Sequence, residues 1–238
     1  MSENRSAAEE HASRVREMFA TIAGRYDLLN HLLSGNVDKR WRRIVANRVR
    51  AKVPISDALI LDVACGTGDL SLTLFETMGA RVVAMDFCRP MLSIAADKVP
   101  GEISLIEGDA LRLPFKDATF DGVTIAFGLR NLANVERGLC ELRRVLRTEG
   151  WVAILEFSRP SNVVLRSFFS LYFRGMLPLM GGLISGSHSA YSYLPASVSR
   201  FPDQSDLALL MEQAGFDQVS YENLTGGIAA LHLGTKPQ

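Results

Sequence analysis

The sequence lacks an excess of charge of either sign. Its 238 residues include 26 basic and 26 acidic side chains, so the formal net charge is zero. Proteins that bind nucleic acids need many lysine and arginine contacts to phosphate groups. We therefore expect no nucleic acid among the partners of this chain.

Cysteine is scarce, and the few cysteines form no pattern. Cys65, Cys88 and Cys140 are odd in number and do not show the spacing of metal ligands. We expect reduced thiols in a cytoplasmic protein, without a disulfide framework and without a metal site. The N-terminal residues are polar and of mixed charge, unlike a signal peptide, which argues against export.

A long uninterrupted apolar run is also missing. The most apolar region covers residues 163–184, but it contains two arginines, a proline and a glycine pair, namely Arg166, Arg174, Pro178, Gly181 and Gly182. A membrane-spanning helix would hardly tolerate these residues together. We expect a chain that is soluble or that only touches a membrane surface.

The sequence does contain a succession of short apolar runs separated by helical segments. Residues 13–50 predict an N-terminal helical cap, because apolar side chains recur every three or four positions, with a polar break at residues 34–36. Five apolar runs follow, at residues 58–64, 81–87, 103–109, 120–127 and 151–158. Such runs are typical of strands that are buried on both faces of a parallel sheet.

The last part of the chain predicts a helix and a hairpin. The helix covers residues 205–214, and two strand-like runs, 216–224 and 228–236, flank the turn signal Thr225-Gly226-Gly227. An antiparallel hairpin added to five parallel strands predicts an α/β fold with a seven-stranded, doubly wound, Rossmann-like sheet. We expect one domain with four parts, which are a helical cap (1–52), a cofactor-binding core (53–158), an irregular lid-like substrate insertion (159–200), and a C-terminal helix with a β-hairpin (201–238).

A glycine-containing loop follows the first predicted strand and opens a helix. Its residues 64–69 read ACGTGD, and glycines there permit a tight turn and the close approach of a ligand to the backbone. The dinucleotide fingerprint G-x-G-x-x-G is incomplete, because Ser71 stands at the third glycine position. The loop therefore indicates a nucleotide-like ligand without identifying it.

Four carboxylates surround this loop in the expected fold. Asp62, Asp69, Asp86 and Asp109 lie at or near the carboxyl ends of predicted strands, where open α/β sheets bind their ligands. They would repel a pyrophosphate and attract S-adenosylmethionine, whose sulfonium and ammonium groups outweigh its one carboxylate. The sequence thus predicts S-adenosylmethionine as the cofactor and argues against a nicotinamide-dependent oxidoreductase.

Individual cofactor contacts can be assigned from these positions. Asp86 ends the second strand, the position from which an acid accepts hydrogen bonds from ribose hydroxyls. Asp109 and Ala110 follow the third strand and suit the adenine ring. The predicted cofactor site is completed by Asp62, Gly66, Thr67 and Gly68.

Two further motifs stand outside the glycine-containing loop. The first is residues 26–34 (YDLLNHLLS), which continues to Trp41, and the second joins residues 144–150 (RVLRTEG) to residues 156–158 (EFS). In both motifs the chain resembles a known family, the C-methyltransferases of menaquinone and ubiquinone biosynthesis. Residues 127–131 (FGLRN) and 223–227 (NLTGG) match as well, so the likeness covers about residues 15 to 236. The resemblance implies the class I methyltransferase form of the predicted sheet.

The reaction that this resemblance implies is methyl transfer from S-adenosylmethionine to a ring carbon of demethylmenaquinol. Residues 26–41 favour the menaquinone branch. Two alternatives stay open: methylation of 2-polyprenyl-6-methoxy-1,4-benzoquinol in ubiquinone biosynthesis, and a quinone-binding subunit without catalytic activity. The ring carbon becomes nucleophilic when a ring hydroxyl loses its proton, so the site needs hydrogen-bond donors and a cation.

The resemblance also implies which residues meet the quinol. Arg130 and Asn131 are the candidates for orienting and stabilising its oxygen, with Tyr26 closing over it. The base is left unassigned, with His31 and His188 as alternatives to a water molecule. Ala126 departs from the family, where serine is common at this place, so we expect no hydroxyl contact to the cofactor there.

Two features suggest how a lipid substrate is reached. The apolar residues 167–184 would line a groove for the prenyl chain or else pack as a core helix. A run of basic residues surrounds Trp41 and forms either a solvated helix face or a patch against the anionic inner face of a membrane, its members being Lys39, Arg40, Arg42, Arg43, Arg48, Arg50 and Lys52. A homodimer is a further open prediction.

Overall fold

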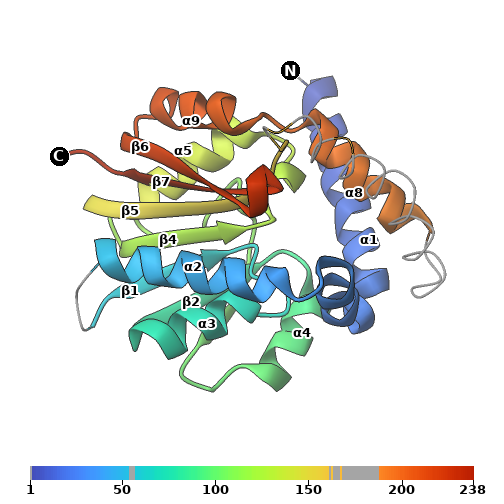
Figure 1. Ribbon diagram of the computed structural model, residues 1–238, viewed down its shortest axis with the longest axis horizontal. Helices are drawn as coiled ribbons and strands as arrows, with labels where there is room; N and C mark the ends of the chain where they lie inside the picture. The colour runs from blue at the N-terminus through green and yellow to red at the C-terminus, as the bar shows by residue number, and fades with distance from the viewer. Residues whose placement is uncertain (1, 54–56, 161, 163–166, 168–187) are drawn as a thin grey trace.

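The computed structural model describes residues 2–53, 57–160, 162, 167 and 188–238 (Figure 1). A seven-stranded sheet runs through it in the order β3-β2-β1-β4-β5-β7-β6. The strands are β1 Leu59–Val63, β2 Arg81–Asp86, β3 Ser104–Glu107, β4 Phe120–Ala126, β5 Leu146–Phe157, β6 Asp217–Leu224 and β7 Ala229–Thr235. Strands β1 to β5 pair in parallel, and β7 runs antiparallel to β5 and β6. The predicted seven-stranded sheet with its C-terminal hairpin is confirmed.

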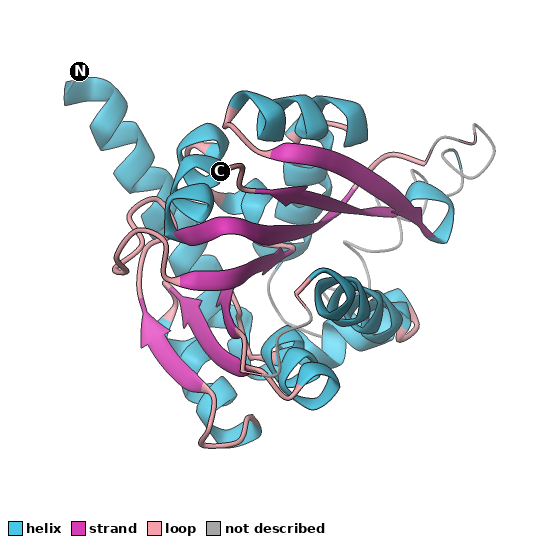
Figure 2. Cartoon of the chain, turned by 90° about the vertical axis from the view of Figure 1, so that its left-hand side faces the viewer, coloured by secondary structure: helices cyan, strands magenta, loops and turns pink. Residues whose placement is uncertain are grey.

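Helices cover both faces of the twisted sheet (Figure 2). The helical segments are α1 Ser2–Ser34, α2 Val37–Lys52, α3 Asp69–Met78, α4 Arg89–Lys98, η1 Leu129–Asn131, α5 Val135–Val145, α8 His188–Arg200, α9 Gln204–Gln213 and the short turn η3 Thr225–Gly227. Helices α2 and α3 share a hydrophobic core with one face of the sheet. Helices α5 and α9 share a second core with the opposite face.

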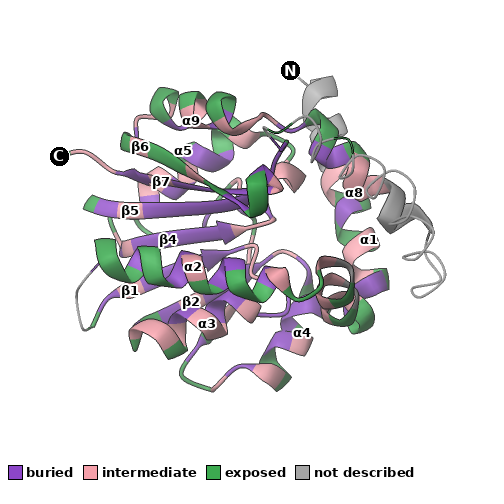
Figure 3. Ribbon diagram, in the orientation of Figure 1, coloured by how far each residue is buried: buried purple, intermediate pink, exposed green. Residues whose placement is uncertain are grey.

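The two cores arise from the alternation of side chains along the strands. In β1, Ile60 belongs to the core under α2 and α3, whereas the next residue, Leu61, belongs to the core under α5 and α9. Both side chains are fully buried, and each contributes about 1.5–3 kcal/mol by leaving water. Figure 3 shows the same pattern, with buried residues along the central strands and exposed residues on the outer sides of α2 and α9.

Helix α1 lies beyond the carboxyl ends of the parallel strands, side by side with α8 (Figure 1). Its first part was outside the predicted helical segment, but the break at residues 34–36 is confirmed, because α1 ends at Ser34 and α2 begins at Val37. Val15, Ile22 and Ala23 of α1 are buried. Helix α1 therefore covers the edge of the sheet at which ligands are expected, whereas α2 packs on one face of the sheet.

The insertion differs from the expectation where it is described. Residues 188–200 form helix α8, although we expected irregular structure there. The sequence hides this helix because Pro195 and four serines interrupt its pattern, yet Leu194, Val198 and Phe201 recur at helical spacing and the last two are buried. The predicted apolar groove at residues 167–184 lies outside the described residues, apart from Ser167. Within the described part of the chain, no helix combines the length and apolar character needed to cross a bilayer.

The basic run of α2 is only partly a surface feature. Trp41 is 4% exposed and donates a hydrogen bond from Nε1 to Thr225 Oγ1 at 2.9 Å. Arg42 is also buried, whereas Lys39, Arg40 and Arg43 are exposed. The prediction of a basic helix face is therefore wrong for Trp41 and Arg42. These two side chains point into the protein, because one side of an amphipathic helix packs against the core.

Gly68 offers a test of how the loop after β1 is packed. It has a φ of +83°, and a Cβ atom there would lie 2.8 Å from Val99 Cγ1. Gly79, at the other end of α3, has a φ of +63° but open space around it. We expect Gly79→Ala to lower the free energy of unfolding by about 1–2 kcal/mol through backbone strain, and Gly68→Ala by roughly 1–3 kcal/mol more through the clash. Urea unfolding of both variants measures the difference, and equal losses would contradict the packing role.

Candidate functional site

A cleft lies at the carboxyl ends of β1, β2 and β4, next to α1. We call it the strand-end cleft; its lining consists of Ala12, Phe19, Tyr26, Ala64, Gly66, Met85, Asp86, Phe87, Met91, Gly108, Asp109, Ala110, Leu111, Ala126, Phe127, Gly128, Asn131, Leu132 and Ala133. Most of these side chains are apolar, and the carboxylates come from Asp86 and Asp109. Such a mixture, with few polar groups in apolar walls, is typical of small-molecule sites.

Asp86 is fixed at the end of β2 by two backbone donors. The N–H of Gly66 donates to Oδ2 and the N–H of Cys88 donates to Oδ1, each at 2.8 Å. The side chain is 6% exposed, and burial raises the pKa of Asp86 above its ordinary value. Each carboxylate oxygen keeps a further lone pair, so Asp86 is positioned to accept hydrogen bonds from a ligand in the cleft.

The predicted adenine contacts reach the same cleft. Asp109 is exposed, and its Oδ1 accepts a hydrogen bond from the N–H of Leu111 at 2.8 Å. Ala110 is buried beside it. Phe87 and Met91 line the cleft as well, and sequence reasoning missed both. The available signal was their position, because Phe87 directly follows Asp86 and Met91 lies in the first turn of α4.

A second, smaller pocket adjoins the cleft, because the two share Tyr26, Ala64 and Gly66. We call it the loop pocket; it is lined by Tyr26, Arg42, Asp62, Ala64, Cys65, Gly66, Thr67, Asp69, Leu70, Ala126 and Phe127. A Cβ atom on Gly66 would stand 3.9 Å from Tyr26 Cε1, so a side chain there would fill the space between the loop and the cap. Glycine keeps that space open.

Asp62 lies deep at this pocket. It is 1% exposed, and its carboxylate accepts hydrogen bonds from Ser71 Oγ at 2.6 Å and from Thr124 Oγ1 at 2.8 Å. Burial outweighs these bonds and raises the pKa of Asp62 to about 6. The carboxyl group therefore changes its charge close to neutral pH and responds to any charge placed beside it.

The other two predicted loop residues have different surroundings. Thr67 lines the loop pocket, but its hydroxyl donates to Asp27 Oδ1 and accepts from Lys98 Nζ, the latter at 3.2 Å. Gly68 packs against Val99 and Ala95 and is absent from the described lining of both pockets. Asp62, Gly66 and Thr67 thus lie together at the loop pocket, whereas Gly68 lies against Ala95 and Val99.

Asp69 belongs to a network of charges that joins the cap to the loop. Its carboxylate lies 2.6 Å from Lys98 Nζ and 3.2 Å from Arg42 Nη1. Lys98 also lies 2.8 Å from Asp27 of α1, and Arg42 pairs with Asp38. Asp69 thus lines the loop pocket with two cations beside its charge. The i, i+4 spacing of Asp38 and Arg42 was the signal for part of this network.

His31 completes the network on the side of α1. Its Nδ1 lies 2.8 Å from Asp38 Oδ2, and its Nε2 lies 3.9 Å from Asp69 Oδ2. Ligand atoms of His31, Asp38 and Asp69 lie within 4.8 Å of one another, but the Arg42 guanidinium contacts both carboxylates and supplies the cation there. The described lining of the strand-end cleft, of the loop pocket and of a third pocket next to α1 does not include His31. His31 is therefore a poor candidate for the base. The side chain of His188 lies outside the described structure.

A third pocket lies between the cap and the ends of β4 and β5. We call it the cap pocket; its lining is Met18, Phe19, Ile22, Tyr26, Asn30, Ser34, Asp38, Trp41, Arg42, Phe127, Arg130, Phe157, Tyr193 and Leu194. The ring centroids of Phe127 and Phe157 are 4.6 Å apart, and that of Trp41 lies 6.0 Å from Phe127. These rings form an aromatic wall suited to a flat apolar group.

Arg130 stands at this wall with its charge compensated. Its Nη1 lies 2.8 Å from Glu156 Oε2, and both side chains are almost fully buried. The backbone N–H of Arg130 donates to Glu156 Oε1 at 3.1 Å. The Nε of Arg130 is buried and has no hydrogen-bond partner among the described residues, so this donor can still serve a group bound beside it. Glu156, which sequence reasoning assigned only to a motif, thus holds Arg130 in place.

Tyr26 and Asn131 complete the predicted catalytic residues. Tyr26 lines the strand-end cleft, the loop pocket and the cap pocket, so it stands where the three meet. Burial raises the pKa of Tyr26, and the charge of Arg130 acts against this rise. Asn131 lines the cleft, donates to the carbonyl oxygen of Phe127 at 3.2 Å, and accepts from the Tyr193 hydroxyl at 3.1 Å.

Comparisons with known proteins agree with the motifs. The sequence profile of the ubiE/COQ5 methyltransferase family matches residues 6–236. A demethylmenaquinone methyltransferase of Thermus thermophilus is 50% identical over 224 residues, which are 92% of this chain and 100% of that protein. A ubiquinone/menaquinone biosynthesis C-methyltransferase UbiE of Pseudomonas paraeruginosa is 40% identical over 235 residues, covering 96% of this chain and 91% of the relative.

Solved structures support the fold. A SAM-dependent methyltransferase of Thermotoga maritima has a TM-score of 0.64 at 18% identity, with 92% of this chain and 99% of that chain covered. At that identity the likeness shows the fold alone, and it confirms the predicted class I methyltransferase architecture. The family profile and the relatives confirm the resemblance stated from the motifs. The chain belongs to the ubiE/COQ5 methyltransferase family.

Proposed function

We propose that this protein methylates a ring carbon of demethylmenaquinol, with S-adenosylmethionine as the methyl donor. The observation that carries the proposal is the position of Tyr26, where the acidic cleft meets an aromatic pocket that contains a buried arginine. The name of the Thermus relative, at 50% identity, supports the menaquinone branch. The alternative in ubiquinone biosynthesis rests on relatives at 40% identity.

The residues present fit S-adenosylmethionine. The open space at Gly66 admits a ligand next to the backbone, Asp86 has acceptors for two ribose hydroxyls, and Asp109 with Ala110 borders the part of the cleft suited to adenine. Asp62 in the loop pocket would face the ammonium group, and Arg42 the carboxylate. When bound, this cofactor supplies an electrophilic sulfonium methyl group.

The quinol would occupy the cap pocket. Its flat ring suits the wall of Trp41, Phe127 and Phe157. The unpartnered Nε–H of Arg130 is available to a ring oxygen and would stabilise negative charge there as the hydroxyl proton leaves. Arg130 is a poor base because guanidinium groups stay protonated, so a water molecule is the candidate proton acceptor.

Tyr26 and Asn131 would fix the geometry around this oxygen. Burial raises the pKa of Tyr26, so its hydroxyl remains a hydrogen-bond donor at neutral pH. Asn131 is held by Phe127 and Tyr193 and lines the cleft, so it would lie between the two bound ligands. Holding both ligands in one orientation is what makes the transfer effectively intramolecular.

Several other roles belong to the same proposal. Residues 159–200 would serve as a substrate lid. The protein would be cytoplasmic and would work at the inner face of a membrane. Exposed basic residues of α2, such as Arg40 and Arg43, would form a solvated helix face. A homodimer and the four-part division of the chain remain predictions.

The proposal is tested by methyl transfer in vitro. The purified chain is incubated with S-adenosylmethionine that carries an isotope-labelled methyl group and, separately, with demethylmenaquinol or 2-polyprenyl-6-methoxy-1,4-benzoquinol. Mass spectrometry should find the label on a ring carbon of the naphthoquinol product. Labelling of the benzoquinol alone would move the chain to the ubiquinone branch. Binding of either quinol without any transfer would support the non-catalytic alternative.

The role of Arg130 can be separated from folding. We expect Arg130→Lys to lower kcat about a hundredfold, because the planar guanidinium donor is lost, and to change the Kd for S-adenosylhomocysteine less than about twofold. The double variant Arg130→Met with Glu156→Gln removes both buried charges together and should fold but lack activity. Full activity of either variant would contradict the proposed stabilisation of the quinol oxygen.

Asp62 should couple cofactor binding to pH. Burial raises the pKa of Asp62 to about 6, and a ligand ammonium group beside it would favour the charged carboxylate and lower that pKa. Binding of S-adenosylhomocysteine should therefore release a proton near pH 6, and its affinity should fall about tenfold between pH 7 and pH 5. Calorimetry in buffers of different ionisation enthalpy measures the proton. Asp62→Asn should abolish the release, and an unchanged release in this variant would assign the proton to another group.

A further inference from the structure

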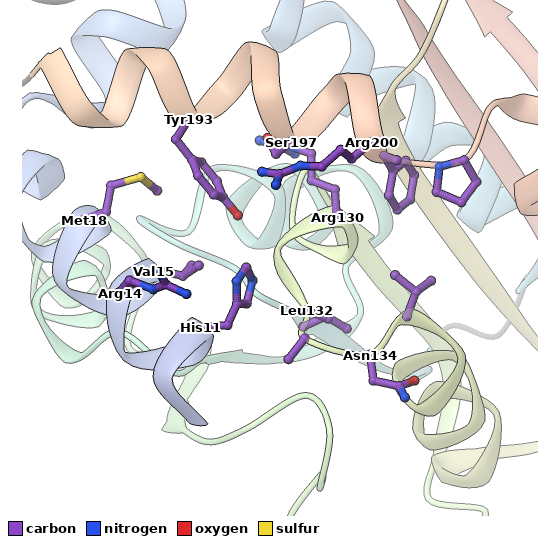
Figure 4. A pocket seen from close by; sticks show the side chains of 14 residues that line it. His11, Arg14, Val15, Met18, Arg130, Leu132, Asn134, Tyr193, Ser197 and Arg200 are labelled. Carbon is purple, nitrogen blue, oxygen red and sulfur yellow. The ribbon is translucent and has the colours of Figure 1, made fainter. Parts of the chain in front are cut away.

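A large cavity separates α1 from α8 on the side of η1, and the function proposed above does not use it. It has a volume of about 680 Å³, which is in the range of sites for small-molecule ligands. Figure 4 shows His11 and Arg14 at the cavity on α1, Tyr193 and Arg200 on α8, and Arg130 with Leu132 on the side of η1. We call it the α1–α8 cavity.

The charged side chains that line this cavity, among the described residues, are all basic. Arg14 and Arg200 are exposed and line it, and neither forms an ion pair with a residue that the structure describes. The one polar contact of the Arg200 side chain given by the described residues is a hydrogen bond from Nε to the carbonyl oxygen of Ala196 at 3.2 Å. None of the described lining residues is acidic. Two uncompensated guanidinium groups at one cavity suit a phosphate, which they can bind in the bidentate manner.

Much of the remaining lining is apolar, and the cavity is larger than a bare anion needs. Val15, Met18, Leu132 and Phe201 contribute side chains beside the arginines. A free phosphate would leave these surfaces without a partner, whereas a phospholipid carries a phosphate next to glycerol and acyl chains. The combination of cationic and apolar lining therefore favours a lipid headgroup.

The cavity adjoins the cap pocket. Met18, Arg130 and Tyr193 line both spaces. Asn131 connects their walls, because its carbonyl oxygen lies 3.3 Å from His11 Nε2 of α1 and its Oδ1 accepts from the Tyr193 hydroxyl of α8. A lipid held there would place the membrane surface next to the pocket proposed for the quinol.

We propose that the α1–α8 cavity binds the headgroup of an anionic membrane phospholipid, with Arg14 and Arg200 on its phosphate. The choice of a lipid rather than a free phosphate rests on the proposed prenylated quinol substrate. The binding of a phosphate group by the two arginines does not depend on that proposed function. This site is distinct from the basic residues of α2 and assigns membrane contact to α1 and α8.

The test is a flotation assay of the full chain with lipid vesicles, without cofactor or quinol. Wild-type protein should bind vesicles of phosphatidylcholine with phosphatidylglycerol more tightly than vesicles of phosphatidylcholine alone. Arg14→Ala with Arg200→Ala should lower the partition coefficient about tenfold or more. The matched control, Arg40→Ala with Arg43→Ala, removes the same charge from exposed positions of α2 and should change it less than about twofold.

Three outcomes would overturn the assignment. The first is equal loss in the cavity variant and its control, which would indicate general charge attraction. The second is unchanged binding of the cavity variant. The third is binding of inorganic phosphate through Arg14 and Arg200 without any preference for anionic vesicles. Replacement of both arginines by lysine should keep most of the vesicle binding, which guards against a folding defect. Labelled methyl transfer to a quinol without a tail is measured in parallel, so that failure of the lipid site is not confused with failure of the proposed reaction.

Discussion

The neutralisation of Asp69 is the interaction on which the rest of the site depends. This carboxylate starts α3 and lies 2.6 Å from Lys98 and 3.2 Å from Arg42. Lys98 also binds Asp27 of α1, and Arg42 also binds Asp38 of α2. One acid in the loop therefore joins both cap helices to the end of α4. The pairs are partly shielded from water, where attraction between charges is stronger than at an open surface.

This arrangement determines which charges a ligand meets. With Asp69 compensated, the carboxylates left for a ligand are Asp62 and Asp86, both buried, and the more exposed Asp109. Burial raises the pKa of Asp62 and that of Asp86, so a cationic ligand beside either carboxylate would favour its charged form. The electrostatic case for the proposed sulfonium cofactor thus rests chiefly on two buried acids, one in each of two adjoining pockets.

Much of the fold and part of the site follow from local patterns in the sequence. The parallel strands were predictable because residues such as Ile60 and Leu61 are apolar on successive positions, which requires burial on both faces. Asp86 was predictable because ligands bind at the carboxyl ends of such strands. Tyr26, Arg130 and Asn131 came from the family motifs, and the structure places them around adjoining pockets.

Long-range pairs account for most of what was missed. Arg42 belongs to a basic run and looks like a surface residue until the fold brings Asp69 to it, next to its local partner Asp38. Glu156 and Arg130 are 26 residues apart, and only the pairing of β4 with β5 brings them together. Gly68 stays a predicted ligand contact, and its packing against Val99 could not be foreseen because Val99 lies 31 positions further along the chain.

Hydrogen exchange of α1 tests most directly whether these charges hold the cap over the pockets. In Lys98→Met, which removes the cation bound to Asp27 of α1 and to Asp69, amides of residues 18–34 should exchange at least about tenfold faster than in the wild type, while amides of β1 and β4 keep their protection. Arg89→Met, which removes a positive charge from an exposed position of the same helix α4, should leave α1 unaffected. Unchanged exchange of α1 in Lys98→Met would contradict the account, because the charge link between α1 and the loop would then contribute nothing to holding the cap.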